Sequence, residues 1–301
     1  MPTVINYAES FQRELLTKYE RELVSFELTQ SNPQVQFLNA QTIKLPDLTL
    51  SGYKDHDRQG SGFNAGTHTN TWTPMKLEHD RDIEFRLDPM DIDETNLVLA
   101  VANFTSQFEE QQAIPEKDSY RFSKLYAEAV TYAANGAHVD TTTLTTANVL
   151  TWFDERMAEM DDASVPEEGR ILYCTAAFKT LLKNAQQLTR TMNVGTGAGD
   201  AVSRIINRMD EVRIKTVPSA RFKTLYTFTD GCAPAATAKQ MNSMLIHPSC
   251  VVSRDKYSYI HLFSPGHDSR TADSYIYQNR YYTDTFLLKK RAAGIAINAS
   301  A

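Results

Sequence analysis

The chain has 301 residues, of which 42% are hydrophobic, 23% charged and 10% aromatic, with only 12 Gly and 11 Pro. These proportions exclude a disordered tail, a collagen-like repeat and a low-complexity scaffold. The formal net charge of -6 argues against a dedicated nucleic-acid binder, which needs a basic face. It leaves open a protein that merely encloses nucleic acid. One large domain or two moderate ones are both compatible with this length.

The cysteines and the first residues of the chain indicate in which cellular compartment the protein is made. Cys174, Cys232 and Cys250 lie far apart without a CxxC pair, which predicts buried thiols in a reducing compartment. The opening MPTVINYAESFQRELL has no basic flank before an apolar core, so we expect no signal peptide. No apolar run of about 18 residues occurs, so we expect no membrane span.

The first stretch has the periodicity of an amphipathic helix, with charged residues between its apolar positions. An apolar stripe at a chain terminus has to be buried. It docks either on its own domain or on a neighbouring subunit, and both remain open. The stripe consists of Tyr7, Phe11, Leu15, Tyr19 and Leu23.

Alternating polar and apolar residues predict two extended strands between residues 35 and 88. Between them, residues 51–72 are polar, Gly-rich and far longer than the usual hairpin turn of about 2 to 5 residues. An isolated two-stranded arm is marginally stable in water. We therefore expect this arm to be mobile or held down by another molecule. The alternating apolar positions are Ile43, Leu45, Met75, Leu77, Ile83, Phe85 and Leu87.

Two helices are predicted next. Asp91 or Asp93 caps the first, which ends before Pro115. The second follows from DSYRFSKLYAEAVTYAANG and stops at Gly136. Its apolar side holds Phe122, Leu125, Ala129 and Ala133.

The rest of the chain has a mixed α/β pattern. TTANVLTWFDERMAEMDD predicts a helix capped by Thr145 or Thr146, and RILYCT a short buried strand followed directly by a helix in AAFKTLLKNAQQL. VRIKTVPSARF predicts a strand broken by Pro218. The segments AKQMNSMLIHP and KYSYIHLFSP alternate helix and strand, and the closing RYYTDTFLLKKRAAGIAIN predicts a strand.

No motif supports catalysis, a cofactor or a metal. GTGAGD, residues 195–200, lacks the ending of a P-loop and the spacing of a dinucleotide fingerprint, so it predicts a loop. The adjacent His267 and Asp268 are the best acid–base pair by composition, but a loop turn explains them better. Cys174 sits in an apolar strand as a structural thiol. The histidines form no zinc-site spacing.

The order of these features resembles the major capsid protein of tailed bacteriophages with the HK97-type fold. Several phrases also resemble one branch of that family. They are EKDSYRFSKLYAEA, GRILYCTAAFKTLLKNA, VPSARFKT, AKQMNSMLIHPS and ADSYIYQNRYYTDTFLLKKRAAGIAIN. The resemblance covers nearly the whole chain and implies an α+β capsid fold with an N-terminal arm, an extended hairpin loop, a spine helix, and peripheral and axial domains.

On this resemblance the chain divides into five parts. They are an N-terminal arm at 1–34, the extended-loop hairpin at 35–88, a peripheral domain with the spine helix at 89–138, an axial domain at 139–250, and a return to the peripheral domain at 251–301.

The resemblance implies a structural virion protein, made in the host bacterial cytoplasm. It would self-assemble into hexamers and pentamers of an icosahedral shell that encloses double-stranded DNA without sequence-specific binding. Because no long scaffolding segment precedes the N-terminal helix, a separate scaffolding protein is the expected partner, together with a portal and no membrane. We expect no covalent cross-link.

The extended loop would lie across a neighbouring subunit. Aromatic residues and arginine dominate interface energetics, which nominates the residues of the loop and of the N-terminal helix. The predicted inter-subunit contacts are Tyr7, Phe11, Leu15, Tyr53, Lys54, Asp57, Arg58, Phe63 and Trp72.

Two alternatives remain. An encapsulin, a cellular nanocompartment of the same fold, encloses enzymes rather than DNA. A soluble α/β hydrolase or nucleotide-binding enzyme would use His267, Asp268 or the loop at Gly195.

Overall fold

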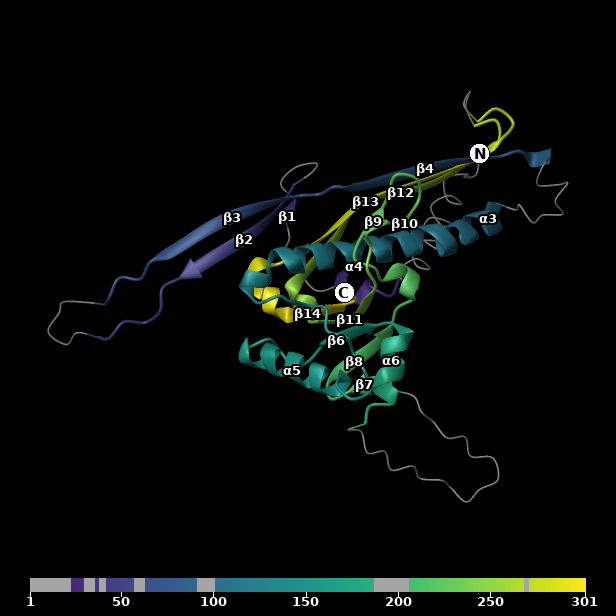
Figure 1. The fold of residues 1–301 in the computed structure, drawn as a ribbon. Coiled ribbons are helices and arrows are strands. Elements are labelled where there is room, and N and C mark those ends of the chain that lie inside the picture. Colours follow the sequence, from purple (N-terminus) through teal and green to yellow (C-terminus); the bar gives the residue numbers. More distant parts are fainter. Residues whose placement is uncertain are drawn as a thin grey trace, which may run out of the picture.

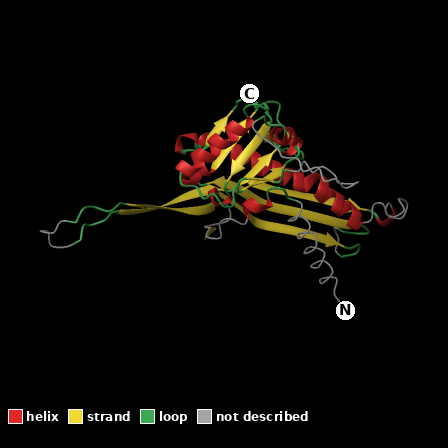
Figure 2. Cartoon of the chain, turned by 90° about the horizontal axis from the view of Figure 1, so that it is seen from below, coloured by secondary structure: helices red, strands yellow, loops and turns green. Residues whose placement is uncertain are grey.

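The computed structural model describes residues 23–29, 36–37, 42–56, 63–90, 101–186, 206–267 and 271–301. The described chain forms a body of sheets and helices from which a long β-arm projects (Figures 1 and 2). The predicted N-terminal helix, the helix cap at Asp91 or Asp93 and the loop at 195–200 lie outside these residues.

A long helical element crosses the body. It comprises α3 (Val101–Phe108), a π-helical segment η2 (Glu109–Ala113) and α4 (Ile114–Thr131). The prediction that a helix ends before Pro115 is wrong, because the helix continues through it. A proline ring crowds the carbonyl four residues earlier, here that of Gln111. This carbonyl lies in the π-helical turn, whose wider winding makes room for the ring.

The C-terminal end of α4 largely confirms the sequence prediction. Phe122, Leu125 and Ala129 are fully buried on one side of the helix. Ala133 lies beyond α4, in the 3-10 helix η3 (Ala133–Asn135), and is exposed. Gly136 follows with a φ of +98°, the left-handed conformation that ends a helix.

The longest strands form a three-stranded antiparallel sheet on which α4 packs through β13 (Figure 2). The prediction of one strand between residues 72 and 88 needs correction, because β3 and β4 are separate and belong to different sheets. In sheet order, the strands are β12 (Val251–Phe263), β13 (Tyr275–Leu287) and β4 (His79–Leu87).

The projecting arm confirms the predicted hairpin. β2 and β3 pair antiparallel over their nine positions, from Thr42 opposite Lys76 to Leu50 opposite His68. The connection is shorter than expected, because β3 begins at His68 and contains Trp72. The strands of this sheet are β1 (Gln36–Phe37), β2 (Thr42–Leu50) and β3 (His68–Lys76).

A second, six-stranded sheet holds the middle of the chain and its end. Its order is β5-β14-β11-β6-β8-β7, with parallel pairs β14–β5 and β6–β8. The strands are β5 (His138–Asp140), β6 (Ile171–Cys174), β7 (Arg208–Met209), β8 (Val212–Thr216), β11 (Met241–Ile246) and β14 (Ile295–Ala299).

Two helices lie beside this sheet (Figure 1). α6 (Ala176–Lys183) directly follows β6, as predicted, and the Thr175 hydroxyl accepts from the backbone N–H of Phe178 at 3.3 Å. α5 (Val149–Asp162) begins later than predicted. The amide oxygen of Asn148 accepts from Thr145 and holds the preceding residues in a turn.

The predicted closing strand is also divided. The 3-10 helix η6 (Lys289–Gly294) separates β13 from β14, so the two halves enter different sheets. Pro218 ends β8 as predicted and precedes η4 (Ser219–Arg221). The remaining short elements are η1 (Phe26–Thr29), β9 (Tyr226–Thr227), β10 (Ala233–Pro234) and η5 (Pro248–Cys250).

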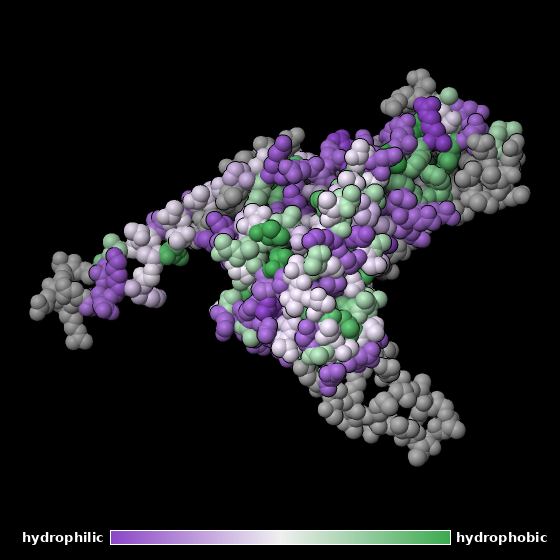
Figure 3. Space-filling view, in the orientation of Figure 1, coloured by the Kyte–Doolittle hydropathy of each residue, from purple (hydrophilic) through white to green (hydrophobic). Residues whose placement is uncertain are grey.

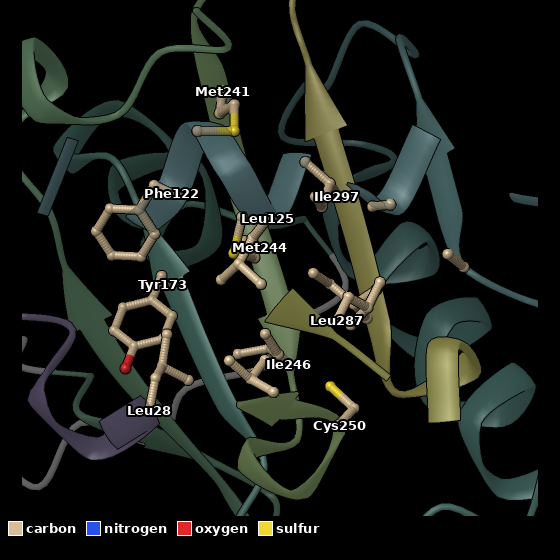
Figure 4. Close-up of a cluster of buried hydrophobic side chains, with 14 of the residues drawn as sticks. Leu28, Phe122, Leu125, Tyr173, Met241, Met244, Ile246, Cys250, Leu287 and Ile297 are labelled. Carbon is tan, nitrogen blue, oxygen red and sulfur yellow. The ribbon is translucent and has the colours of Figure 1, made fainter. Parts of the chain in front are cut away.

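The main apolar core lies between α4 and the six-stranded sheet. Phe122 and Leu125 of α4 face Met244 and Ile246 of β11, and Leu28 of η1 lies beside Tyr173 (Figure 4). A second cluster packs α5 and α6 against the same sheet, through Trp152, Phe153 and Phe178 among others. The helix therefore joins both sheets, and its burial supplies a large part of the hydrophobic stabilisation.

Replacing Gly136 by alanine tests the end of α4. A Cβ at this position would lie 3.1 Å from the Cβ of Ala293, in a backbone conformation that disfavours L-residues. We expect the free energy of unfolding to fall by about 1–2 kcal/mol. Urea unfolding followed by tryptophan fluorescence measures it. Gly52→Ala is the control, because nothing lies within 4 Å of its added Cβ; equal effects would contradict the expectation.

Candidate functional site

The end of the arm is the most exposed part of the described chain. The backbone N–H of Ser51 donates to the carbonyl of Thr67 at 2.9 Å, which closes the paired part of the hairpin. Beyond it, Asn64 donates to the carbonyl of Asp55 at 2.7 Å. Tyr53 and Phe63 are fully exposed, and the arm extends well beyond the body (Figure 3). Large apolar side chains therefore face solvent on an element without a core of its own.

The predicted contact residues fall into two groups. Tyr53, Lys54, Phe63 and Trp72 lie on the arm, the first three at its outer end and Trp72 in β3 with 43% of its surface exposed. The others, Tyr7, Phe11, Leu15, Asp57 and Arg58, lie outside the described residues. Their role as contacts stays a prediction.

Within the described residues, the arm is joined to the body by an apolar cluster at its base and by a hydrogen bond to Thr49, near the outer end of β2. At the base, Ile43 and Leu77 are buried with Val252 of β12 and Phe286 of β13. The ammonium group of Lys290 donates to the hydroxyl of Thr49 at 3.0 Å. A small cluster at one end leaves most of a hairpin to be stabilised from outside the chain.

Asp118 of α4 anchors the segment before η1. This side chain is fully buried and accepts from the backbone N–H groups of Val24 and Ser25 and, at 2.7 Å, from the Ser25 hydroxyl. Arg121, one turn further along, donates to the same hydroxyl at 3.0 Å. Arg221 adds a second cation 3.6 Å from Asp118. The entry of the N-terminal segment into the body is thus held by buried charged groups.

Lys117 of α4 is buried and forms an ion pair with Asp255 of β12, whose side chain is 39% exposed. Its ammonium group lies 2.7 Å from Asp255, and Arg121 lies 3.6 Å from the same carboxylate. Burial by itself would raise the pKa of Asp255, but the two cations outweigh it and lower the pKa to about 2. Burial lowers the pKa of Lys117, and Asp255 opposes that shift. Asp255 is therefore ionised at neutral pH, and its contact with Lys117 fixes β12 against the helix.

Glu116 connects α4 to the other edge of the same sheet. Its carboxylate accepts from Arg81 of β4 at 2.7 Å and from the Tyr281 hydroxyl of β13 at 2.9 Å. His79 lies nearby, and burial, with Arg81 and Lys117, lowers its pKa to about 3. His79 is therefore neutral at physiological pH, and Arg81 is the charged partner of Glu116.

Glu128 of α4 and Asp284 of β13 are two carboxylates that accept hydrogen bonds where α4 meets the three-stranded sheet. Asp284 accepts from the Tyr120 hydroxyl and from the backbone N–H of Glu78, both at 2.9 Å. The backbone N–H of Leu287 donates to Glu128. Burial, aided by the nearby Asp284, raises the pKa of Glu128 to about 7, against the opposing effects of Leu287 and Lys124. Glu128 therefore titrates near neutral pH.

The buried charges of α4 were missed by sequence reasoning. EKDSYRFSK has an amphipathic pattern, and charged residues on such a helix are expected to face solvent. In the structure Lys117, Asp118 and Arg121 are all buried. Each has a partner far away in the sequence, so no local spacing could have shown it.

Of the residues considered for catalysis, His267 and Cys174 lie within the described part of the chain. His267 is exposed, and Asp268 and the loop at Gly195 lie outside the described residues. Cys174 is buried in β6, and burial raises the pKa of its thiol to about 12. Within the described ranges, no group of three or more His, Cys, Asp or Glu residues could hold a metal ion. Among these same residues, no helix has the length and apolar composition needed to cross a membrane.

The combination of a long helix, a projecting hairpin and two sheets defines an α+β chain of the HK97-type capsid fold, which confirms the fold expected from the sequence. Comparison with solved structures supports this assignment. The chain is similar to the bacteriophage PhiM1 mature capsid, with a TM-score of 0.61, 12% identity, and coverage of 87% of this chain and 82% of that one.

Two further structures show the range of the similarity. The capsid of the cyanophage P-SCSP1u matches with a TM-score of 0.62 and 11% identity over 88% of this chain and 85% of that one. A virus-like particle from Pyrococcus furiosus matches with a TM-score of 0.50 and 8% identity, over 98% of this chain and 100% of that one. At these identities the likeness concerns the fold. No protein-family model matches the sequence, and a search of curated proteins finds no match either.

Removing the Asp118 carboxylate tests the anchor of the N-terminal segment. Asp118→Ala leaves two backbone N–H groups, the Ser25 hydroxyl and Arg221 without their buried partner, so we expect a loss of about 3–5 kcal/mol in stability. Chymotrypsin should cleave at Phe26 or Leu28 faster than in the unmodified protein. The control is Asp154→Ala on α5, an exposed carboxylate; equal cleavage rates in the two variants would contradict the anchor.

Glu128→Gln tests how the ionisation of Glu128 affects the stability of the protein. Because the folded protein raises the pKa of Glu128 from 4.5 to about 7, its ionisation destabilises the fold as pH rises through this interval. Glutamine keeps an oxygen acceptor for Leu287 but cannot ionise. We expect the variant to gain roughly 2–4 kcal/mol relative to the unmodified protein between pH 4 and pH 8. Urea unfolding at both pH values measures this, and a pH-independent difference would disprove it.

Proposed function

We propose that the chain is a major capsid protein that assembles, through hexamers and pentamers, into an icosahedral shell enclosing a phage double-stranded DNA genome. The observation that carries the proposal is the combination of the capsid fold with an arm whose exposed aromatic end has no partner surface within the described chain. A neighbouring copy would supply that surface. Aromatic side chains on an extended strand pair bury large areas at little entropic cost.

The proposed role is structural, without a catalytic step. The chain would reside in the virion after synthesis in the host cytoplasm. A separate scaffolding protein would direct assembly, and a portal would occupy one vertex. The net charge of -6 is compatible with enclosing DNA, because a wall that bound phosphates tightly would oppose its packing.

The second candidate is a shell around a cellular cargo. The similarity to the Pyrococcus furiosus virus-like particle favours it, since it spans nearly all of both chains, although its TM-score is lower than those of the two phage capsids. Nuclease protection separates the candidates. Particles purified from infected or induced cells should contain nuclease-resistant DNA; particles with a protein cargo and no DNA would favour the compartment.

A deletion of residues 54–64 tests the role of the arm. It leaves Ser51 paired with Thr67 across a four-residue turn of Gly52, Tyr53, Ala65 and Gly66. We expect the body to keep its fold and its secondary structure by circular dichroism. Electron microscopy should show no closed shells, because the contacts that extend to the neighbouring copy are lost.

A matched variant separates contact from length. Replacing residues 54–64 by an equally long Gly-Ser sequence keeps the reach of the arm but removes its aromatic and charged side chains. We expect this variant also to assemble poorly. Normal shells from both variants would show that the end of the arm makes no essential contact.

A further inference from the structure

The three-stranded sheet presents a groove on the face opposite α4. Along β13, Tyr282, Arg280 and Gln278 alternate with residues directed toward the helix. Two adjoining hollows, of about 610 and 560 Å³, lie on this face and share Tyr257 and Arg280 in their linings. They adjoin at Tyr257 and Arg280, and together they are called the groove. From residue 278 to residue 282 it spans about 13 Å of strand.

One wall of the groove is aromatic. Tyr257 and Tyr259 of β12 have parallel rings, with an interplanar angle of 4° and centroids 6.4 Å apart. Tyr257 is 47% exposed. Tyrosine rings in this position offer apolar surface at the ring face and a hydroxyl at the tip. They provide a stacking platform within reach of water.

The floor and the opposite wall are polar and ordered. Arg280 donates two hydrogen bonds to Asp80, at 3.0 and 2.7 Å, and its guanidinium lies 5.7 Å from the centroid of the Tyr257 ring. The amide of Gln278 donates to Glu84 at 2.7 Å. These side chains are planar and held in position by each other. They therefore present hydrogen-bond donors and acceptors in a fixed arrangement.

The charges of the lining narrow the class of ligand. The lining contains four carboxylates, at every second position from Glu78 to Glu84, and the three cations Lys76, Lys256 and Arg280. A nucleic acid would meet the carboxylates and a basic peptide would meet the cations. An apolar helix would cover both signs of charge and desolvate them. A neutral ligand that donates and accepts hydrogen bonds and also has an apolar face satisfies the whole lining.

We propose that this groove binds a short neutral oligosaccharide. The C–H face of a sugar ring would stack on Tyr257 and Tyr259. Its hydroxyls would donate to the carboxylates of Asp82 and Glu84 and accept from Arg280 and Gln278. The groove is long enough for several rings rather than one. Such binding goes beyond the formation of a shell and would attach the protein to a glycan surface.

Calorimetric titration with maltohexaose, cellohexaose and chitohexaose tests the proposal on the full-length protein. Assembled shells and the unassembled fraction from size exclusion are both titrated. The groove is then accessible in at least one sample, whether it faces the inside or the outside of a shell. Each hexasaccharide is titrated up to about 10 mM, which would saturate a site with a weak Kd of about 1 mM. At least one of the three should bind in this range. Tyr257→Ala and Tyr259→Ala should weaken binding at least about tenfold.

Two controls isolate the ring stacking. Tyr257→Phe keeps the ring and should stay within about threefold of the unmodified affinity. Val130→Ala removes an apolar side chain of similar exposure, 50% against 47% for Tyr257, from α4 and should leave binding unchanged. Electron microscopy of each variant scores shell formation separately, so a failure of the proposed assembly is told apart from a failure of glycan binding.

Three results would overturn the proposal. One is the absence of binding by all three hexasaccharides in both states of the protein. Another is binding that Tyr257→Ala leaves unchanged. The third is Tyr257-dependent binding of a lysine decapeptide or of the oligonucleotide dT10 without any glycan binding, which would reassign the groove to a peptide or a nucleic acid.

Discussion

The buried charged face of α4 is the interaction on which the rest of the described structure depends. Three consecutive residues each bind a different segment: Glu116 contacts Arg81 of β4, Lys117 contacts Asp255 of β12, and Asp118 holds the backbone before η1. Removing one member of such a set leaves an uncompensated buried charge, which costs several kcal/mol. The helix therefore fixes both edges of the three-stranded sheet and the entry of the N-terminal segment together.

The arm is built on the opposite principle. Its strands are fully paired with each other, and the apolar packing that the described side chains make with the body is the small cluster around Ile43 and Leu77 at the base. A protein that assembles with copies of itself would use both a rigid body and an arm that needs an external surface. The rigid body gives every copy the same shape, and the arm is stabilised by the neighbouring copies.

The features of the fold that depend on neighbouring residues could be predicted from the sequence, and those that depend on distant residues could not. The hairpin, the short strand before α6 and the stop at Gly136 follow from local periodicity, capping and backbone conformation, and the structure contains all three. The continuation of the helix through Pro115 did not follow, because the π-helical turn that accommodates it is stabilised by distant partners. Glu109 in that turn accepts from Tyr277 and Asn279 of β13.

Composition and charge, from the start, excluded a disordered or strongly basic protein, and local patterns determined most helices and strands, because those depend on neighbouring residues. Only the tertiary structure decided that β4 leaves the hairpin to pair with β13, that Lys117, Asp118 and Arg121 are buried, and that Tyr257 and Arg280 meet in one groove. Strand pairing and ion pairs of this kind join residues more than a hundred positions apart, and their free energy exists only once the chain has folded.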